Sequence, residues 1–290
     1  MPTLKETKGR IASVRSTLKI TSAMKLVASA KLRGAQRAIE SMRPYEEELQ
    51  RILAAASAST PAVAAAPSAN EGTVAHGHSV IVAISSNSSL CGSFNANVIS
   101  KVKTVRKKGD VVYSIGRKMA DAMRREGFRS PQDLNALSEH PAYAPCAELV
   151  SKLMEDFNAG KVGKVMLVYN HFVSTSHQEP VVEQLLPVSH SERSEESVMQ
   201  GPDQESPDII LEPSPSELLS ALEPKVLKLK LYAALLDSSA AEHAARTVAM
   251  QTATDNGEKL LDELTLQYNK GRQQKITNEI LDLAGGQTKD

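Results

Sequence analysis

The sequence predicts an α/β protein in which two long terminal helices form an antiparallel coiled coil, with an α/β domain inserted between them. Apolar residues recur at three- and four-residue steps near both ends of the chain, whereas the middle contains short apolar runs typical of strands. A long helix with an apolar stripe needs a partner, and the two terminal segments alone have this length. We therefore expect them to pair, with the inserted domain mounted on the resulting rod.

The N-terminal helix is expected from Leu4 to about Ala56, as a coiled-coil domain over residues 1–56. Pro44 is the position where a kink is expected, because proline lacks the N–H that continues a helix. Thr21 and Ser22 make a polar gap in the stripe. The apolar stripe comprises Ile11, Val14, Leu18, Ala28, Leu32, Ala35, Ile39, Met42, Leu49 and Leu53.

This first helix is strongly basic. Between Met1 and Arg43 it has ten Lys and Arg residues against two acids, Glu6 and Glu40, a net charge of +8, although the whole chain has a formal net charge of zero. A solvated helix face would explain any single lysine. A cluster with ten bases and only two acids favours contact with an acidic surface.

The middle of the chain is predicted to be a linker over residues 57–78, rich in Ala, Ser and Pro, followed by an α/β domain over residues 79–188. Alternation of strands and helices predicts a small, parallel, Rossmann-like sheet. A loop from His171 to Pro180 separates the last two strands. The expected strands are 80–84, 110–115, 165–169 and 181–186, and the expected crossover helices are 95–108, 118–126 and 146–158.

An acidic, flexible loop is predicted over residues 189–214, with a possible short strand near 208–212. Between Glu192 and Glu217 there are eight acids against Arg193, so this stretch has little apolar surface to bury. The C-terminal coiled-coil helix is expected over 215–284, opened by Ser214 as a cap and followed by a tail at 285–290. Its stripe comprises Leu222, Val226, Leu229, Ala233, Leu236, Ala240, Met250, Thr254, Gly257, Leu261, Leu264 and Tyr268.

The inserted domain lacks the motifs of a catalytic or nucleotide-binding site. No glycine-rich fingerprint follows its first strand, and Gly160–Lys164 lacks the spacing of a P-loop. The histidines, His171 and His177 among them, are too scattered to indicate a metal site, and Cys91 is best interpreted as a buried structural thiol. We therefore expect no cofactor and no metal, and we interpret the sheet as a scaffold.

Four segments resemble the gamma subunits of bacterial F-type ATP synthases. They are LKETKGRIASVRSTLKITSAMKLVASAKLRGAQ, SLCGSFNANV, YNHFVSTSHQEP and SSAAEHAARTVAMQTATDNGEKLLDELTLQYNKGRQQKITNEI. The match covers nearly all of both terminal helices and several points of the middle. The resemblance implies a non-catalytic central-stalk rotor that couples rotation of a membrane ring to conformational change in the catalytic subunits during ATP synthesis.

The same resemblance implies the partners and the contact residues. The partners are the ring of catalytic and non-catalytic subunits (alpha and beta), the epsilon subunit and the proton-carrying c-ring, with a peripheral location on the cytoplasmic side of the bacterial inner membrane. Arg and Gln side chains suit acidic partner loops through charge-assisted hydrogen bonds. The implied rotor–stator contact residues are Met24, Lys25, Arg246, Arg272, Gln273, Thr277 and Glu279.

The chain departs from this family at several points. Asn87-Ser88-Ser89 stands where the family has Asp-Arg-Gly, Ser93 replaces a glycine, and Gly271 replaces an alanine, at a cost of about 1 kcal/mol if that helix position is exposed. Small residues from Ser238 to Ala245 fit a shaft that turns smoothly in a sleeve and also fit ordinary close helix packing, and both can hold at once.

Two other classes stay open on the residues alone. A basic coiled-coil scaffold that binds nucleic acid would explain the charged first helix, although no aromatic residue precedes Tyr45 to stack on bases. An unrecognised α/β enzyme would explain the middle, although it lacks a recognisable catalytic arrangement.

Overall fold

The computed structural model describes residues 3–58, 78–187, 212 and 214–286. The chain divides into two compact units, one formed by Met1–Ala30 with Arg246–Asp290 and the other by Lys31–Ala245. Most of the predicted linker, of the predicted acidic loop with its possible strand, and of the C-terminal tail lies outside the described residues; the two ends of the linker, residues 57–58 and 78, belong to the first helix and the first strand. Those three predictions therefore stay predictions.

Both long terminal helices are present. Helix α1 spans Leu4–Ala58 and α7 spans Pro215–Gly286. The α-helical assignment of α1 continues through Pro44. The predicted cap of α7 is confirmed, because the Glu217 backbone N–H donates to Ser214 Oγ at 3.3 Å. Periodicity thus located both helices to within a few residues of their ends.

In the first unit, the two helices pair antiparallel. Residue numbers rise along α1 as they fall along α7 at four contacts: Leu4 with Gly271, Leu18 with Gly257, Thr21 with Thr254, and Lys25 with Gln251. The polar gap of the sequence is therefore part of the interface, since Thr21 is buried and bonds across it. Gly271 is half-buried and faces α1, because a Cβ there would lie 3.3 Å from Leu4 Cδ2.

The second unit contains a four-stranded sheet in the order β2-β1-β3-β4, built from β1 His78–Ile84, β2 Val111–Ile115, β3 Val162–Phe172 and β4 Gln178–Leu186. Strand β1 pairs parallel with β2 and β3, but β4 pairs antiparallel with β3. The all-parallel prediction is wrong for β4. Strands β3 and β4 extend into the predicted loop and leave only residues 173–177 to connect them, which is a hairpin connection and forces antiparallel pairing.

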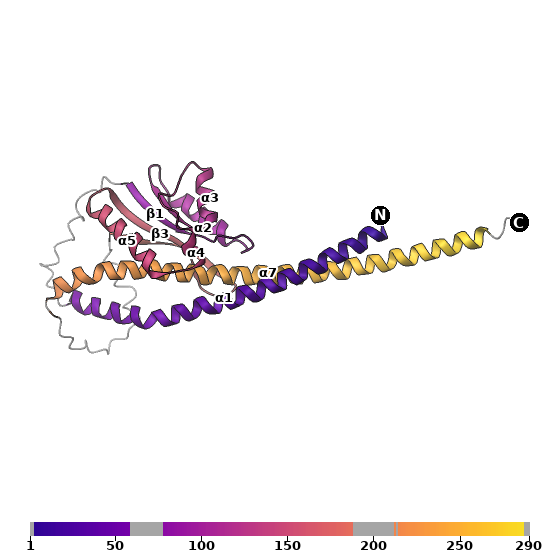
Figure 1. Ribbon diagram of the computed structural model, residues 1–290, viewed down its shortest axis with the longest axis horizontal. Coiled ribbons are helices and arrows are strands. Elements are labelled where there is room, and N and C mark those ends of the chain that lie inside the picture. The colour runs from indigo at the N-terminus through magenta and orange to yellow at the C-terminus, as the bar shows by residue number, and fades with distance from the viewer. Residues whose placement is uncertain (1–2, 59–77, 188–211, 213, 287–290) are drawn as a thin grey trace. The chain divides into compact units, whose positions relative to one another are not determined.

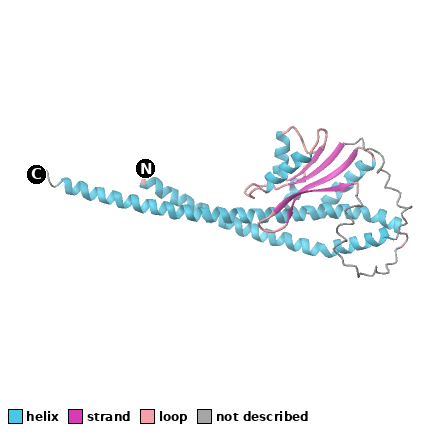
Figure 2. Ribbon diagram, turned by 180° about the vertical axis from the view of Figure 1, so that it is seen from behind, coloured by secondary structure: helices cyan, strands magenta, loops and turns pink. Residues whose placement is uncertain are grey.

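Helices cover both faces of this sheet (Figures 1 and 2). On one face, α2 Phe94–Val105 and α3 Arg117–Arg125 pack their buried Val and Met side chains against β1, β2 and β3. On the other face lie α4 Asn135–Glu139, α5 Tyr143–Asn158 and part of α7. The sequence did not predict α4, which is too short to show a helical period.

Helix α7 is the element through which the sheet attaches to the long helices. Its Leu227, Leu231, Ala234 and Leu235 belong to the same buried cluster as the strands and α5. The small residues that follow, Ala240 to Ala245, pack against Phe94 and Phe172 of the inserted domain. Close packing is therefore confirmed for this stretch, because these alanines admit aromatic rings from the chain itself, and the smooth-shaft interpretation stays a prediction.

Candidate subunit-contact surfaces

The last three turns of α7 form an exposed helical surface. Arg272, Gln273, Thr277 and Glu279, all predicted contacts, are exposed there. Thr277 Oγ1 donates to the Gln273 carbonyl at 2.9 Å, and Lys275 Nζ lies 3.5 Å from Glu279 Oε1. Large apolar side chains share the surface, with Ile276 46%, Ile280 60%, Leu281 62% and Leu283 74% exposed. A helix that exposes this much apolar surface is suited to a partner.

Of the two predicted contacts on α1, Lys25 lies at the antiparallel interface of the first unit. Met24 and Lys25 are both half-buried. Lys25 Nζ donates to Gln251 Oε1 at 2.5 Å, and Gln251 Nε2 donates to Asp255 Oδ1 at 2.6 Å. The Lys25 ammonium is therefore bonded to α7 through Gln251, which in turn bonds Asp255. These contacts favour one register of the two helices.

Arg246 differs from the other predicted contacts because it is only 8% exposed. It makes interactions within the chain. Its expected role toward a partner rests on the resemblance alone and stays a prediction.

The basic character of α1 is displayed at the surface. Nine of its first ten basic residues are exposed, and Lys25 is the half-buried exception. Arg43 forms an ion pair with Glu47 at 3.0 Å within the helix. This pair cancels only one of the ten positive charges, so the helix face remains positive.

The carboxyl end of the parallel strands, where α/β sheets commonly bind nucleotides, is filled by the chain's own polar groups. The first backbone N–H groups of α3 already have acceptors: Arg117 N–H donates to Asn87 Oδ1 at 2.9 Å, Lys118 N–H to the Ser86 carbonyl at 3.1 Å, and Met119 N–H to Ser85 Oγ at 2.9 Å. These N–H groups would otherwise hold a phosphate.

Two further contacts close the same edge. Ser138 Oγ of α4 donates to the Ser85 carbonyl at 2.7 Å, and Asn87 Nδ2 donates to the Asn135 carbonyl at 2.9 Å. Gly116 approaches so closely that a Cβ would lie 2.1 Å from the Ser85 oxygen. Asn87, which departs from the family pattern, therefore ties β1, α3 and α4 together.

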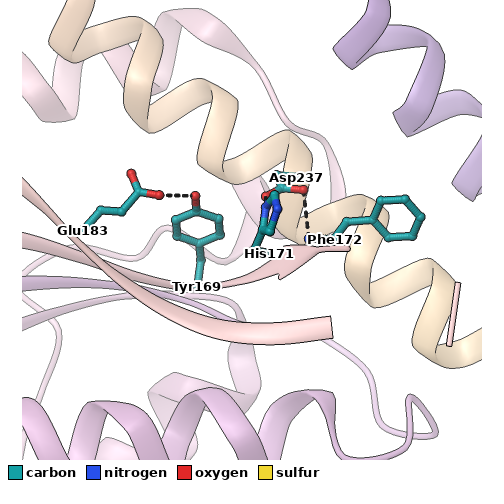
Figure 3. Close-up of polar contacts among 5 residues, drawn as sticks. All are labelled: Tyr169, His171, Phe172, Glu183 and Asp237. Carbon is teal, nitrogen blue, oxygen red and sulfur yellow. Dashed lines mark hydrogen bonds and ion pairs between the residues drawn. The ribbon is translucent and has the colours of Figure 1, made fainter. Parts of the chain in front are cut away.

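Sequence reasoning missed a polar joint between the sheet and α7 (Figure 3). Asp237 of α7 accepts two hydrogen bonds: the Phe172 backbone N–H lies 3.1 Å from Oδ1, and His171 Nδ1 lies 2.6 Å from Oδ2. Because a carboxylate only accepts, the ring Nδ1–H is the donor. His171 had been considered only as a metal ligand, and residues 66 positions apart give no local signal of contact.

A second contact lies next to it on β3 and β4. Tyr169 OH donates to Glu183 Oε1 at 2.5 Å, and Lys230 Nζ of α7 lies 3.5 Å from Glu183 Oε2. Burial, together with the Glu183 carboxylate, raises the pKa of Tyr169, so the phenol stays neutral and continues to donate.

None of the helices in the described part of the chain combines the length and apolar character needed to cross a bilayer. The fold defines a class of protein in which two long terminal helices carry an inserted α/β domain, with charged and apolar side chains exposed on the helices. A family model described as ATP synthase matches residues 3–288.

Curated relatives agree along the full length. The chain is 46% identical to the ATP synthase gamma chain of Bacteroides thetaiotaomicron over 300 residues and 47% identical to that of Bacteroides fragilis over 294 residues, and in each pair 99% of both chains is covered. The chain belongs to the ATP synthase gamma chain family. It is a non-catalytic, central-stalk rotor subunit, so the nucleic-acid scaffold and the α/β enzyme are set aside.

Solved structures share the fold. The chain matches one in the Euglena gracilis mitochondrial ATP synthase rotor with a TM-score of 0.63 at 18% identity, covering 94% of this chain and 98% of that one. It matches another in the Tetrahymena thermophila mitochondrial ATP synthase central stalk and c-ring with a TM-score of 0.55 at 22% identity, covering 81% and 99%. At these identities the likeness supports the fold alone.

Proposed function

We propose that the exposed end of α7 and the basic face of α1 contact the ring of alpha and beta subunits in an F-type ATP synthase, and that the inserted domain contacts the epsilon subunit and the c-ring. The complex is placed at the bacterial inner membrane, with this chain peripheral on the cytoplasmic side and protons as the coupling ion. The observation that carries the proposal is the helical surface of α7 from Arg272 to Leu283, where charged and large apolar side chains are exposed together.

This surface suggests how rotation could drive catalysis. A helix with different side chains around its circumference offers each surrounding subunit a different contact at each rotary angle. Each angle therefore stabilises a different set of subunit conformations, in proportion to the difference in contact free energy. Arg272 and Gln273 would supply directional bonds to acidic loops, and Ile276 and Ile280 would supply apolar contact.

The experiment has two stages. First, the tagged chain expressed in its host should co-purify with ATPase subunits and should show no ATP turnover by itself. Micromolar ATP or ADP binding by the isolated chain in calorimetry would contradict the filled-edge interpretation of the sheet.

Second, Gln273→Ala should lower ATP hydrolysis by the assembled complex without lowering helix stability, because this exposed side chain contributes little to packing. Gln50→Ala, at an exposed position on α1, is the matched control and should leave hydrolysis unchanged. Arg246→Ala is the buried comparison, for which we expect loss of activity together with loss of stability. If Gln273→Ala left hydrolysis intact, the contact role of this surface would be refuted.

A further inference from the structure

Contact between the sheet and α7 has an apolar centre and polar ends. Leu231, Ala234 and Leu235 are fully or almost fully buried in the cluster that includes strand residues. Lys230 and Asp237 flank them and carry the contacts to Glu183, His171 and Phe172 described above. The joint thus combines apolar burial with directional bonds.

The spacing on both elements matches this arrangement. Lys230 and Asp237 are seven residues apart on α7, which is close to two helical turns and puts both on one face. Tyr169 and His171 are two residues apart on β3, which puts both on one face of the strand. Two polar contacts therefore lie along one line between the sheet and the helix.

Phe172 extends the joint beyond Asp237. Its backbone N–H is held by the Asp237 carboxylate, and its ring packs against the small residues Ala240, Ala241 and Ala244 of α7 and against Leu32 of α1. The end of β3 is therefore fixed through its backbone, with its side chain placed between the two long helices.

Apolar contact is non-directional, so it resists separation of two surfaces more than it resists their sliding past each other. Hydrogen bonds weaken steeply once distance and angle change, so they oppose sliding. We propose that Asp237, with the Tyr169–Glu183–Lys230 contact beside it, is the element that locks the sheet domain to α7 against shear, so that torque passes from that domain into the helix. This inference rests on the proposed rotor function.

A joint of this kind matters only under load. When the complex synthesises ATP, the torque that drives the catalytic subunits must pass through the joint. When it hydrolyses ATP with the proton gradient collapsed, little opposes rotation. Loss of the Asp237 bonds should therefore reduce synthesis more than unloaded hydrolysis. Asp237 is a positioning residue in this account and touches no substrate.

The test uses membrane vesicles that carry the whole complex. For each variant, the ATP synthesis rate under an imposed proton gradient is divided by the hydrolysis rate of the same vesicles with a protonophore. Asp237→Ala should lower this ratio roughly threefold or more, since it removes two hydrogen bonds, both accepted by the Asp237 carboxylate. Asp237→Asn, which keeps an oxygen acceptor for the Phe172 N–H, should fall between Asp237→Ala and the wild type.

Asp121→Ala is the matched control, because Asp121 forms a surface ion pair with Arg124 on α3, on the other face of the sheet. Its ratio should equal that of the wild type. Lys230→Met removes the α7 ammonium that lies 3.5 Å from Glu183 Oε2 and donates to the Gln184 carbonyl at 3.3 Å, and it should lower the ratio even if Asp237→Ala prevents assembly.

An unchanged ratio in Asp237→Ala, or in Lys230→Met where Asp237→Ala does not assemble, would overturn the inference. Equal losses of synthesis and hydrolysis, together with a lower melting temperature of the variant complex, would also overturn it, because they would indicate a purely structural role. Failure of the rotor assignment itself would be seen separately, as a wild-type chain that does not co-purify with ATPase subunits.

Discussion

The hydroxyl pair Thr21–Thr254 offers a measurable cross-helix interaction. The two Oγ1 atoms lie 2.9 Å apart between α1 and α7, and Thr21 is 9% exposed. Replacement of either residue by Val removes the hydroxyl while keeping a β-branched side chain of nearly the same shape and helix propensity. The pair therefore suits a double-mutant cycle of Thr21→Val and Thr254→Val.

The expected loss of unfolding free energy follows from the hydrogen bonds that each hydroxyl can make. Each hydroxyl has one proton, so the one that donates across the interface leaves only the other to donate to a carbonyl of its own helix, Thr21 to Leu18 at 3.1 Å or Thr254 to Met250 at 2.9 Å. A single substitution leaves the remaining hydroxyl able to donate to its own-helix carbonyl, so the net loss is one hydrogen bond, about 0.5–1.5 kcal/mol of unfolding free energy. The double variant recovers part of this cost through contact between two apolar side chains, so the expected coupling is about 1 kcal/mol.

The assay is urea unfolding of the full chain followed by circular dichroism at 222 nm, a suitable probe because the chain contains no Trp. The four proteins of the cycle should share one m-value, the slope of unfolding free energy against urea concentration. Differences in the urea midpoint then report differences in stability. Strictly additive effects of the two substitutions would refute the cross-helix bond, and so would a double variant that is destabilised by more than the sum of the two single changes.

Three further predictions test other parts of the chain. Gly271→Ala should raise the unfolding free energy by up to about 1 kcal/mol through helix propensity, less the cost of moving the Leu4 side chain, which would lie 3.3 Å from the new Cβ. A lower unfolding free energy, measured by urea denaturation, would show that Leu4 cannot move aside. Burial raises the pKa of the Cys146 thiol to about 12. Because this folded-state pKa exceeds the unfolded value, the stability from this group is complete below about pH 8.5 and is lost as the pH rises toward 12. Alkylation of Cys146, followed by mass spectrometry, should stay slow in the native chain at pH 9 and become fast in urea. Limited proteolysis of the assembled complex should cut within Glu192–Asp208 before either helix, and deletion of Ser194–Gln204 should leave assembly intact; protection of this segment, or failed assembly, would show that it docks.

Local patterns were sufficient to predict the elements. The three- and four-residue apolar period located α1 and α7, because a helix that buries one face must repeat its apolar residues at that spacing. Runs such as Val80–Ile84 identified strands buried on both faces, and Ser214 identified the start of α7. Where a pattern was short, as in α4, it carried too little signal to find the element.

Contacts between distant residues required the tertiary structure. Strand direction is not encoded by side-chain alternation, so the antiparallel pairing of β4 followed only from the short connection that the folded strands leave. The buried position of Arg246 likewise depends on what packs around α7. The joint at Asp237 brings together residues from β3 and α7, and a sequence records only which side chains are present, whereas the meeting of two faces is decided by how the whole chain packs.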